Sequence, residues 1–380
     1  MENFISYNPT VLHFGRNILS SLGPTLKEFG SKVLLVYGKG SIKRNGLYGK
    51  IKNILAENGM EVFEYEGIRP NPLNRDVDAA AAIGRENKVD VILAVGGGSV
   101  IDSAKIISIT IPVQNPSWDF FTYAAKPEKA IPLVAVLTLA ATGTEMNPFA
   151  VLQNPDTGVK AGYRSTLTFP RHSFLDPELT FSVPKDYTAY GIADLIAHCL
   201  ENYFSVAEST LTDRFILSII SEAMTYGPAL LDDLQNYDLR AKIMFSATMA
   251  LNGLTSLGKN TGDWGVHSAG HVLSFMYDIP HGASLTIIFP AWMKLFRDQI
   301  PGRIASLGSA LFQKSLTPQE SIDQIENFFR SIGCPVRLSE YGITGDVRRE
   351  IFNSMVANKV NGALMKFREE DYLKLIDLFL

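Results

Sequence analysis

The hydrophobic pattern of this chain of 380 residues changes near its middle. In the first half, short apolar runs such as residues 32–37 and 89–95 alternate with segments of helical pattern. This alternation is typical of a parallel sheet covered by helices. From about Pro184 onward, strand-like runs become scarce, and apolar residues recur every ~3.6 positions over long segments. We therefore predict an α/β domain, residues 1–183, followed by an all-helical domain, residues 184–380.

Two of the apolar runs end in glycine-rich turns that lead into a helical segment. They are Gly38-Lys39-Gly40-Ser41 and Gly96-Gly97-Gly98-Ser99. Glycine lets the backbone approach an anion closely, and the N–H groups and dipole of a following helix attract phosphate. Either segment can also be read as a tight turn, and neither matches the G-x-G-x-x-G dinucleotide fingerprint. The pattern indicates a Rossmann-like nucleotide-binding domain without that standard fingerprint.

Histidines recur with an aspartate at helical spacing in the second half. Asp194 and His198 are four residues apart, as are His267 and His271, and His281 follows a short turn. Side chains at positions i and i+4 lie on the same face of a helix, so each pair offers two ligand atoms to one side. One such pair alone is more often a surface pair, but three histidines so close together favour a divalent metal site. A carboxylate with imidazoles suits Fe²⁺ or Zn²⁺ and does not decide between them.

The composition excludes several classes of protein. The net charge of −4 and the lack of a long basic run argue against nucleic acid as a partner. No apolar stretch reaches the ~18 residues of a membrane span, and the first residues lack the layout of a signal peptide. Two cysteines, Cys199 and Cys334, form neither a disulfide framework nor a Cys-x-x-Cys site. We expect a cytoplasmic protein with no nucleic-acid or membrane partner.

Several motifs, in this order along the chain, resemble those of the iron-containing alcohol dehydrogenase family. The motifs are Gly96 to Asp102, Ala141 to Glu145, Phe174 to Glu201 with its Asp194-x-x-x-His198 helix, and His267-x-x-x-His271 with His281-Gly282. They span nearly the whole chain and are most similar to the branch of NADPH-dependent aldehyde reductases and butanol dehydrogenases. The resemblance implies a dinucleotide-binding domain, an all-α metal-binding catalytic domain, and a homodimer. It also implies hydride transfer between NADP(H) and an alcohol/aldehyde pair, in the direction of the primary alcohol.

The resemblance also implies roles for individual residues. The metal ligands would be Asp194, His198, His267 and His281. His271 would stand near the metal without ligating it, and we expect it to relay the proton during catalysis. The residues that would contact the cofactor are Gly38, Lys39, Gly40, Ser41, Asn71, Gly97, Gly98, Ser99, Thr138, Thr142, Asn147 and Lys160.

The end of the first strand bears on the choice of cofactor. NAD-using relatives carry an aspartate there, which binds the ribose hydroxyls and would repel a 2′-phosphate. Here Gly38 occupies that position, followed by Lys39 and Ser41, with Lys43 close behind. A missing acid together with a cation and a hydroxyl favours NADP(H) over NAD(H).

Other functions share parts of this pattern. A metal-dependent hydrolase or lyase would share the ligand cluster but has no need of two glycine-rich turns. Glycerol dehydrogenase and dehydroquinate synthase, which have related folds, are closer alternatives. A non-catalytic nucleotide-binding or metal-binding protein is a further alternative.

Overall fold

The computed structural model describes all 380 residues, which fold into two compact units. One unit is Tyr7–Val183, and the other is Pro184–Leu380 together with Met1–Ser6. The N–H group of Glu2 donates to the carbonyl of Gly258 at 2.9 Å, which ties the first residues to the helical unit. Nothing in the hydrophobic pattern indicates this placement of the first six residues.

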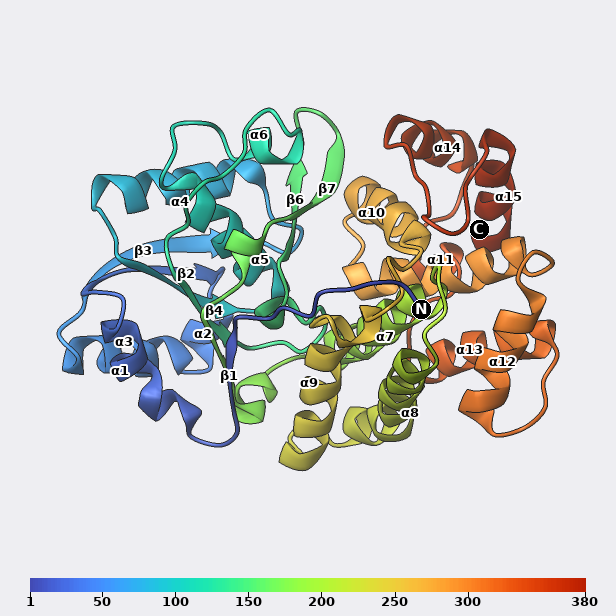
Figure 1. Cartoon of the computed structure of the whole chain (residues 1–380), viewed down its shortest axis with the longest axis horizontal. Coiled ribbons are helices and arrows are strands. Elements are labelled where there is room, and N and C mark those ends of the chain that lie inside the picture. Colours follow the sequence, from blue (N-terminus) through green and yellow to red (C-terminus); the bar gives the residue numbers. More distant parts are fainter. The chain divides into compact units, whose positions relative to one another are not determined.

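The unit Tyr7–Val183 is built on a parallel sheet of six strands (Figure 1). Its strands, in their order across the sheet, are β1 (Val11–Phe14), β8 (His172–Leu175), β5 (Leu133–Leu137), β4 (Val91–Gly96), β2 (Lys32–Gly38) and β3 (Glu61–Ile68). Its helices are α1 (Leu22–Lys27), α2 (Ser41–Arg44), α3 (Leu47–Glu57), α4 (Asn74–Glu86), α5 (Gly98–Thr110) and α6 (Trp118–Phe121). A separate antiparallel hairpin joins β6 (Phe149–Asn154) to β7 (Val159–Arg164). The predicted Rossmann-like α/β domain is confirmed.

Alternate residues of the central strands face opposite layers of helices. Val33, Leu35 and Tyr37 of β2 belong to one buried cluster with residues of α1 and α3. Their neighbours Leu34 and Val36 are also fully buried, so both faces of this strand are covered. Burial on both faces explains why the central strands are continuous apolar runs rather than alternating ones.

The second unit consists of helices. They are α7 (Lys185–Tyr203), α8 (Thr210–Asp232), α9 (Tyr237–Leu251), α10 (Gly265–Tyr277), α11 (His281–Phe296), α12 (Pro301–Phe312), α13 (Pro318–Ser331), α14 (Arg348–Ala357) and α15 (Glu369–Phe379). The chain also makes short 3₁₀ turns at Ile18–Ser21, Thr144–Met146, Thr166–Thr168, Pro177–Thr180, Leu254–Ser256 and Ser339–Tyr341. None of the helices is both long and apolar enough to cross a membrane. The predicted all-helical character of this part is confirmed.

A tight turn brings the ends of α10 and α11 together. Asp278 adopts a left-handed backbone conformation with φ of 52°, which ends α10 directly after Tyr277. Pro280 then precedes the first residue of α11, which is His281. The histidines of α10 and the histidine that opens α11 are thereby held close to one another.

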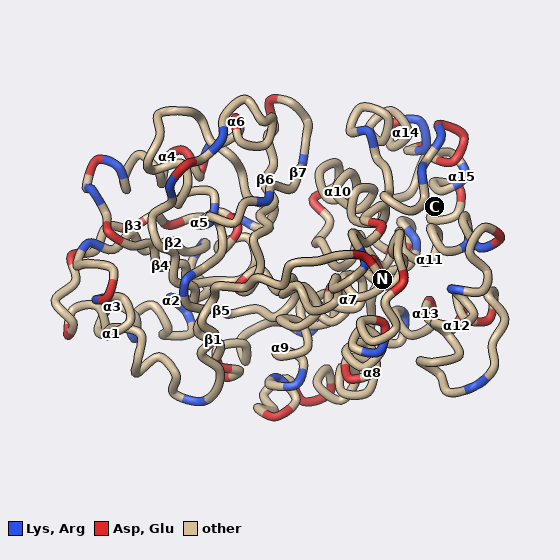
Figure 2. The backbone as a smooth tube through the Cα atoms, viewed as in Figure 1, with Lys and Arg blue, Asp and Glu red and all other residues tan.

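Charged residues of both signs are spread along both units. Figure 2 shows lysine and arginine interspersed with aspartate and glutamate in each unit, in agreement with the net charge of −4. In helix α7, Lys185 and Asp186 are exposed at the start, whereas Asp194, His198 and Glu201 lie in its buried part.

Helices α7 and α11 approach closely at Gly282. A Cβ atom built on Gly282 would stand 2.1 Å from the carbonyl oxygen of Tyr190, which is backbone of α7. Neither helix has room for a side chain at this point, so a glycine is required here.

We predict that Gly282→Ala lowers the free energy of unfolding by about 2 kcal/mol, because the added methyl group forces the two helices apart. Gly302→Ala is the matched control, since Gly302 is likewise the second residue of a helix and a Cβ there meets nothing within 4 Å. The control should be neutral or more stable by up to about 1 kcal/mol. Urea unfolding of both variants tests this, and equal midpoints would contradict the packing argument.

Candidate functional site

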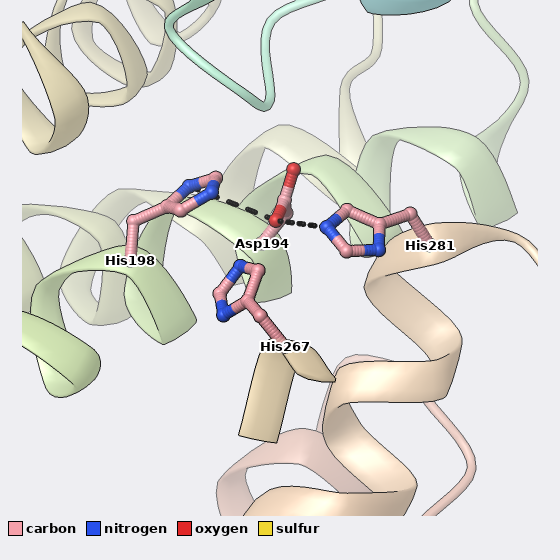
Figure 3. A group of neighbouring side chains, drawn as sticks. All are labelled: Asp194, His198, His267 and His281. Carbon is pink, nitrogen blue, oxygen red and sulfur yellow. Dashed lines mark ion pairs between the residues drawn. The ribbon is translucent and has the colours of Figure 1, made fainter. Parts of the chain in front are cut away.

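Four side chains from three helices of the second unit converge on one point (Figure 3). Asp194 and His198 come from α7, His267 from α10 and His281 from α11. Each offers one ligand atom, and these atoms all lie within 4.8 Å of one another. Oδ1 of Asp194 lies 3.6 Å from Nδ1 of His198 and 3.6 Å from Nε2 of His281. The four residues predicted as metal ligands are thus brought together, from positions far apart in the sequence.

The chemistry of this group fits a divalent cation. Asp194, His198 and His267 are buried, and His281 is partly exposed. Burial lowers the pKa of His198 well below its usual range, and the neighbouring His267 lowers it further. The ring is therefore neutral, which is the form of imidazole that binds metals. Its Nδ1 atom is buried and makes no hydrogen bond, as expected of a side chain arranged for a ligand rather than for the protein alone.

A buried glutamate stands behind this group. Glu201 lies on α7, and its Oε1 atom is 3.0 Å from Nδ1 of His267. The backbone N–H groups of His267 and Trp264 donate to the two oxygens of Glu201, at 2.9 and 2.6 Å. Burial raises the pKa of Glu201 to about 8, while hydrogen bonds from these backbone groups lower it.

His271 lies beside the four residues and is not one of them. It is on α10, one turn after His267, and is half-buried. Its ring centroid is 5.6 Å from that of His281. This position agrees with a residue that stands near a metal, and its catalytic role stays a prediction.

In the α/β unit, the second glycine-rich turn packs against the segment that follows β5. A Cβ built on Gly97 would stand 3.1 Å from Cβ of Leu139, and one on Gly98 would stand 3.0 Å from Oγ1 of Thr142. The N–H group of Thr138 donates to the carbonyl of Gly96 at 3.0 Å. Gly97, Gly98, Thr138 and Thr142, all predicted to contact the cofactor, therefore lie together where β4 and β5 end and α5 begins.

Asn71 and Lys160 form a buried pair. Nζ of Lys160 donates to Oδ1 of Asn71 at 2.8 Å, and Nε2 of Gln153 donates to the carbonyl of Asn71 at 3.0 Å. Both Asn71 and Lys160 are buried, and Asn71 has a left-handed backbone with φ of 54°. The ammonium group of Lys160 is therefore held by a buried amide rather than exposed to solvent.

A buried network around Lys105 holds the loop after β5. Nζ of Lys105, which is fully buried, donates to Thr144 Oγ1 at 2.6 Å, to Asn147 Oδ1 at 3.1 Å and to the carbonyl of Phe149 at 2.6 Å. Thr144 donates in turn to Asp102 at 2.5 Å. Burial lowers the pKa of Lys105 to about 8, against the attraction of Asp102.

Asn147 belongs to this network, and both ends of its side-chain amide are used by the protein. Its Nδ2 donates to the carbonyl of Gly143 at 2.9 Å, and its Oδ1 also accepts from the N–H group of Phe149 at 2.9 Å. Asn147 therefore shapes the loop from within. A direct contact of Asn147 with the cofactor stays a prediction.

The first glycine-rich turn has an acidic neighbour. Gly38 ends β2, and Gly40 has a left-handed backbone with φ of 110° before the short helix α2. Nζ of Lys43 in α2 donates to Oε2 of Glu66 at 2.6 Å. Glu66 lies on β3 and pairs in register with Tyr37 of β2. A carboxylate thus stands beside the turn, although it comes from the neighbouring strand.

The sequence reasoning missed Glu201, Lys105 and Glu66. Glu201 had a signal, because it follows His198 by three positions and so lies one helical turn further along the same face. Lys105 also had one, since a lysine in an otherwise apolar helix needs a buried partner. Glu66 had no such signal, because it meets Lys43 only through the pairing of β2 with β3.

Comparison with known proteins identifies relatives over the full length. A family model described as "Iron-containing alcohol dehydrogenase" matches residues 9–177, and one described as "Fe-containing alcohol dehydrogenase family, C-terminal" matches residues 188–378. The chain is 41% identical over 388 residues to a probable NADH-dependent butanol dehydrogenase 2 of Bacillus subtilis, covering 99% of each. It is 35% identical over 356 residues to the NADPH-dependent aldehyde reductase YqhD of Escherichia coli, covering 91% of this chain and 90% of the relative.

A solved structure is similar throughout. The crystal structure of NADH-dependent butanol dehydrogenase A from Thermotoga maritima superposes with a TM-score of 0.97 at 36% identity. The match covers 100% of this chain and 99% of the other.

Proposed function

Because this chain belongs to the iron-containing alcohol dehydrogenase family, we propose that it reduces aldehydes to primary alcohols, with NADP(H) as its preferred cofactor. It is a metal-dependent, NAD(P)-linked alcohol dehydrogenase or aldehyde reductase. The observation that carries the proposal is the set of four ligand atoms within 4.8 Å of one another in the helical unit.

The donor set suits the chemistry of carbonyl reduction. A bound Fe²⁺ or Zn²⁺ supplies Lewis acidity toward the oxygen of the substrate, and a bound nicotinamide supplies the hydride. Asp194 contributes one negative charge, while the three imidazoles are neutral ligands. The ligand set therefore leaves a divalent site with net positive charge. We assign to His271 the transfer of the proton between the substrate oxygen and solvent, because it is half-buried beside His281.

The α/β unit supports cofactor binding in three places. Gly97 and Gly98 at the first turn of α5 allow close approach of a pyrophosphate, and the N–H groups of α5 attract it. Lys160, which is oriented by Asn71, supplies a cation for the ribose or nicotinamide side. The turn Gly38–Ser41 would contact the adenosine ribose.

The preference for NADP(H) is supported by Gly38, which lacks the carboxylate that would repel a 2′-phosphate, and by the exposed Lys39 and Ser41 beside it. The names of the relatives include both NADH-dependent and NADPH-dependent enzymes. Glu66 works against the preference for NADP(H), because it forms an ion pair with Lys43 and so makes that cation less available to a 2′-phosphate. We also propose a cytoplasmic homodimer. The family resemblance supports the dimer, and the two free, buried cysteines fit a reducing compartment.

The function is tested with protein loaded separately with Fe²⁺ and with Zn²⁺, then mixed with a panel of aldehydes. We expect aldehyde-dependent loss of the absorbance of the reduced nicotinamide, with a lower KM for NADPH than for NADH. A lower KM for NADH would reverse the proposed preference alone. Absence of any net NAD(P)H oxidation with either metal would favour a hydrolase or lyase.

Glu66→Gln tests how the cofactor is selected. The substitution releases Lys43 and removes a negative charge near the turn, so the KM for NADPH should fall about threefold to fivefold. A change of this modest size is expected for a solvent-exposed ion pair, and the KM for NADH should hardly change. Glu61→Gln is the matched control, because Glu61 makes the same charge change at the other end of β3. Equal effects of the two variants would show that only net charge matters.

Measuring the bound metal in variants distinguishes a ligand, such as His281, from the neighbouring His271. We expect His281→Ala to lose bound metal on dialysis, because it removes one of four ligands. His271→Ala should keep the metal and turn over about 100-fold more slowly, as for a lost proton-transfer group. His172→Ala is a control in the other unit and should keep both metal and activity. Parallel loss of metal and activity in His271→Ala would make His271 a ligand.

A further inference from the structure

We propose that Glu201 is a positioning residue that fixes His267 and the start of α10 against α7, so that the ligand geometry exists before metal is bound. The inference rests on the metal site of the proposed function. It adds a residue that touches neither metal nor substrate and acts through a ligand.

The contacts of Glu201 are specific and buried. Glu201 is 1% exposed. Its Oε1 atom accepts from the backbone N–H of His267 at 2.9 Å and lies 3.0 Å from the ring Nδ1 of the same residue. Its Oε2 atom accepts from the backbone N–H of Trp264 at 2.6 Å. One carboxyl group therefore reaches both the main chain and the ring of a single ligand.

These contacts select one tautomer of His267. The ionised carboxylate of Glu201 can only accept hydrogen bonds, so in that form it places the ring proton of His267 on Nδ1 and the lone pair on Nε2. In Figure 3 the His267 ring points toward Asp194. Glu201 thus sets both the direction of the ring and the nitrogen that would ligate. A carboxylate behind a ligating histidine commonly does this.

Glu201 also caps α10 from a different helix. Trp264, which precedes the first residue of α10, has a left-handed backbone with φ of 63° and no side-chain cap of its own. The first turn of a helix leaves backbone N–H groups without intrahelical partners. Glu201 accepts from two N–H groups at this end, where a carboxylate is also favoured by the helix dipole. The register between α7 and α10 is thereby tied to the residue that orients His267.

Asp263 provides a matched comparison within the same helix start. It is 1% exposed, like Glu201. It accepts from the backbone N–H groups of Gly265, Leu364 and Met365, at 3.2, 2.7 and 2.7 Å. These contacts are with backbone groups and involve no histidine ring. A change at Asp263 therefore disturbs the same helix start without removing the bond to His267.

The experiment compares Glu201→Gln with Asp263→Asn in the full-length protein. Zinc affinity is measured by competition with a chelator, and the absorption spectrum is recorded with Co²⁺ in place of zinc. Thermal unfolding of the metal-free proteins is measured alongside. We expect both variants to lose stability. Zinc affinity should fall about 10- to 100-fold only in Glu201→Gln, with an altered Co²⁺ spectrum, and stay within about threefold of wild type in Asp263→Asn.

Wild-type zinc affinity in Glu201→Gln would overturn the proposal, and so would equal losses of affinity in the two variants. If Glu201→Gln does not fold, Glu201→Asp replaces it. This variant keeps the charge but is too short to reach Trp264 and the ring together, so unchanged zinc affinity there would also overturn the proposal. A wild-type protein that binds no zinc would overturn the metal site and this inference together. A wild-type protein that binds zinc but reduces no aldehyde would overturn the proposed function alone.

Discussion

The burial of α7 is the constraint on which the helical unit depends. Residues 191–203 of this helix are all buried, yet Asp194, His198 and Glu201 carry ionisable groups and recur at positions i, i+4 and i+7, on one face. Burying such groups is costly unless neighbouring elements supply partners. Helix α10 supplies His267 and backbone N–H groups, and α11 supplies His281 beside Asp194. The packing of these three helices therefore brings the ligand group together.

The α/β unit also buries an ionisable group, and there its partners all come from the protein itself. Lys105 is buried and Asp102 is partly buried on α5, and Thr144 joins them through one hydroxyl group. Asp102 also accepts from the N–H group of Val151 at 2.9 Å, so β6 is attached to the same network. Removing an acceptor of the buried Lys105 ammonium group would cost about 1 to 3 kcal/mol or more, because part of its hydrogen-bonding capacity would be left unsatisfied. These contacts attach the loop beside the glycine-rich turn to both α5 and β6.

Local spacing explains which features could be predicted from the sequence. The strands β2, β4 and β5 are apolar runs bounded by turns or helices, and α7 and α10 carry their pairs of site residues at i and i+4, so one short window reveals each. The strands β1 and β8 are only four residues long, and the hairpin β6–β7 carries Gln153, Lys160 and Arg164. Those strands lack a clear pattern. Pairings such as Lys43 with Glu66, or Lys105 with Thr144, arise only when distant segments meet, and no window of sequence contains both partners.

The network around Lys105 and the group of Asp194 with its three histidines differ in whether their polar atoms have hydrogen-bond partners within the protein. In the network of Lys105, the donors and acceptors named above are matched inside the protein, and its role is to hold a loop. In the helical unit, Nδ1 of His198 is buried and makes no hydrogen bond, a state that costs about 1 to 3 kcal/mol for a polar group. The surrounding helices do not relieve this cost, although Glu201 stands one turn away and is fully engaged with α10. Burial keeps the His198 ring neutral, and its Nδ1 atom lies 3.6 Å from Oδ1 of Asp194. This arrangement is better explained as two ligands placed to bind one metal ion than as a defect of packing.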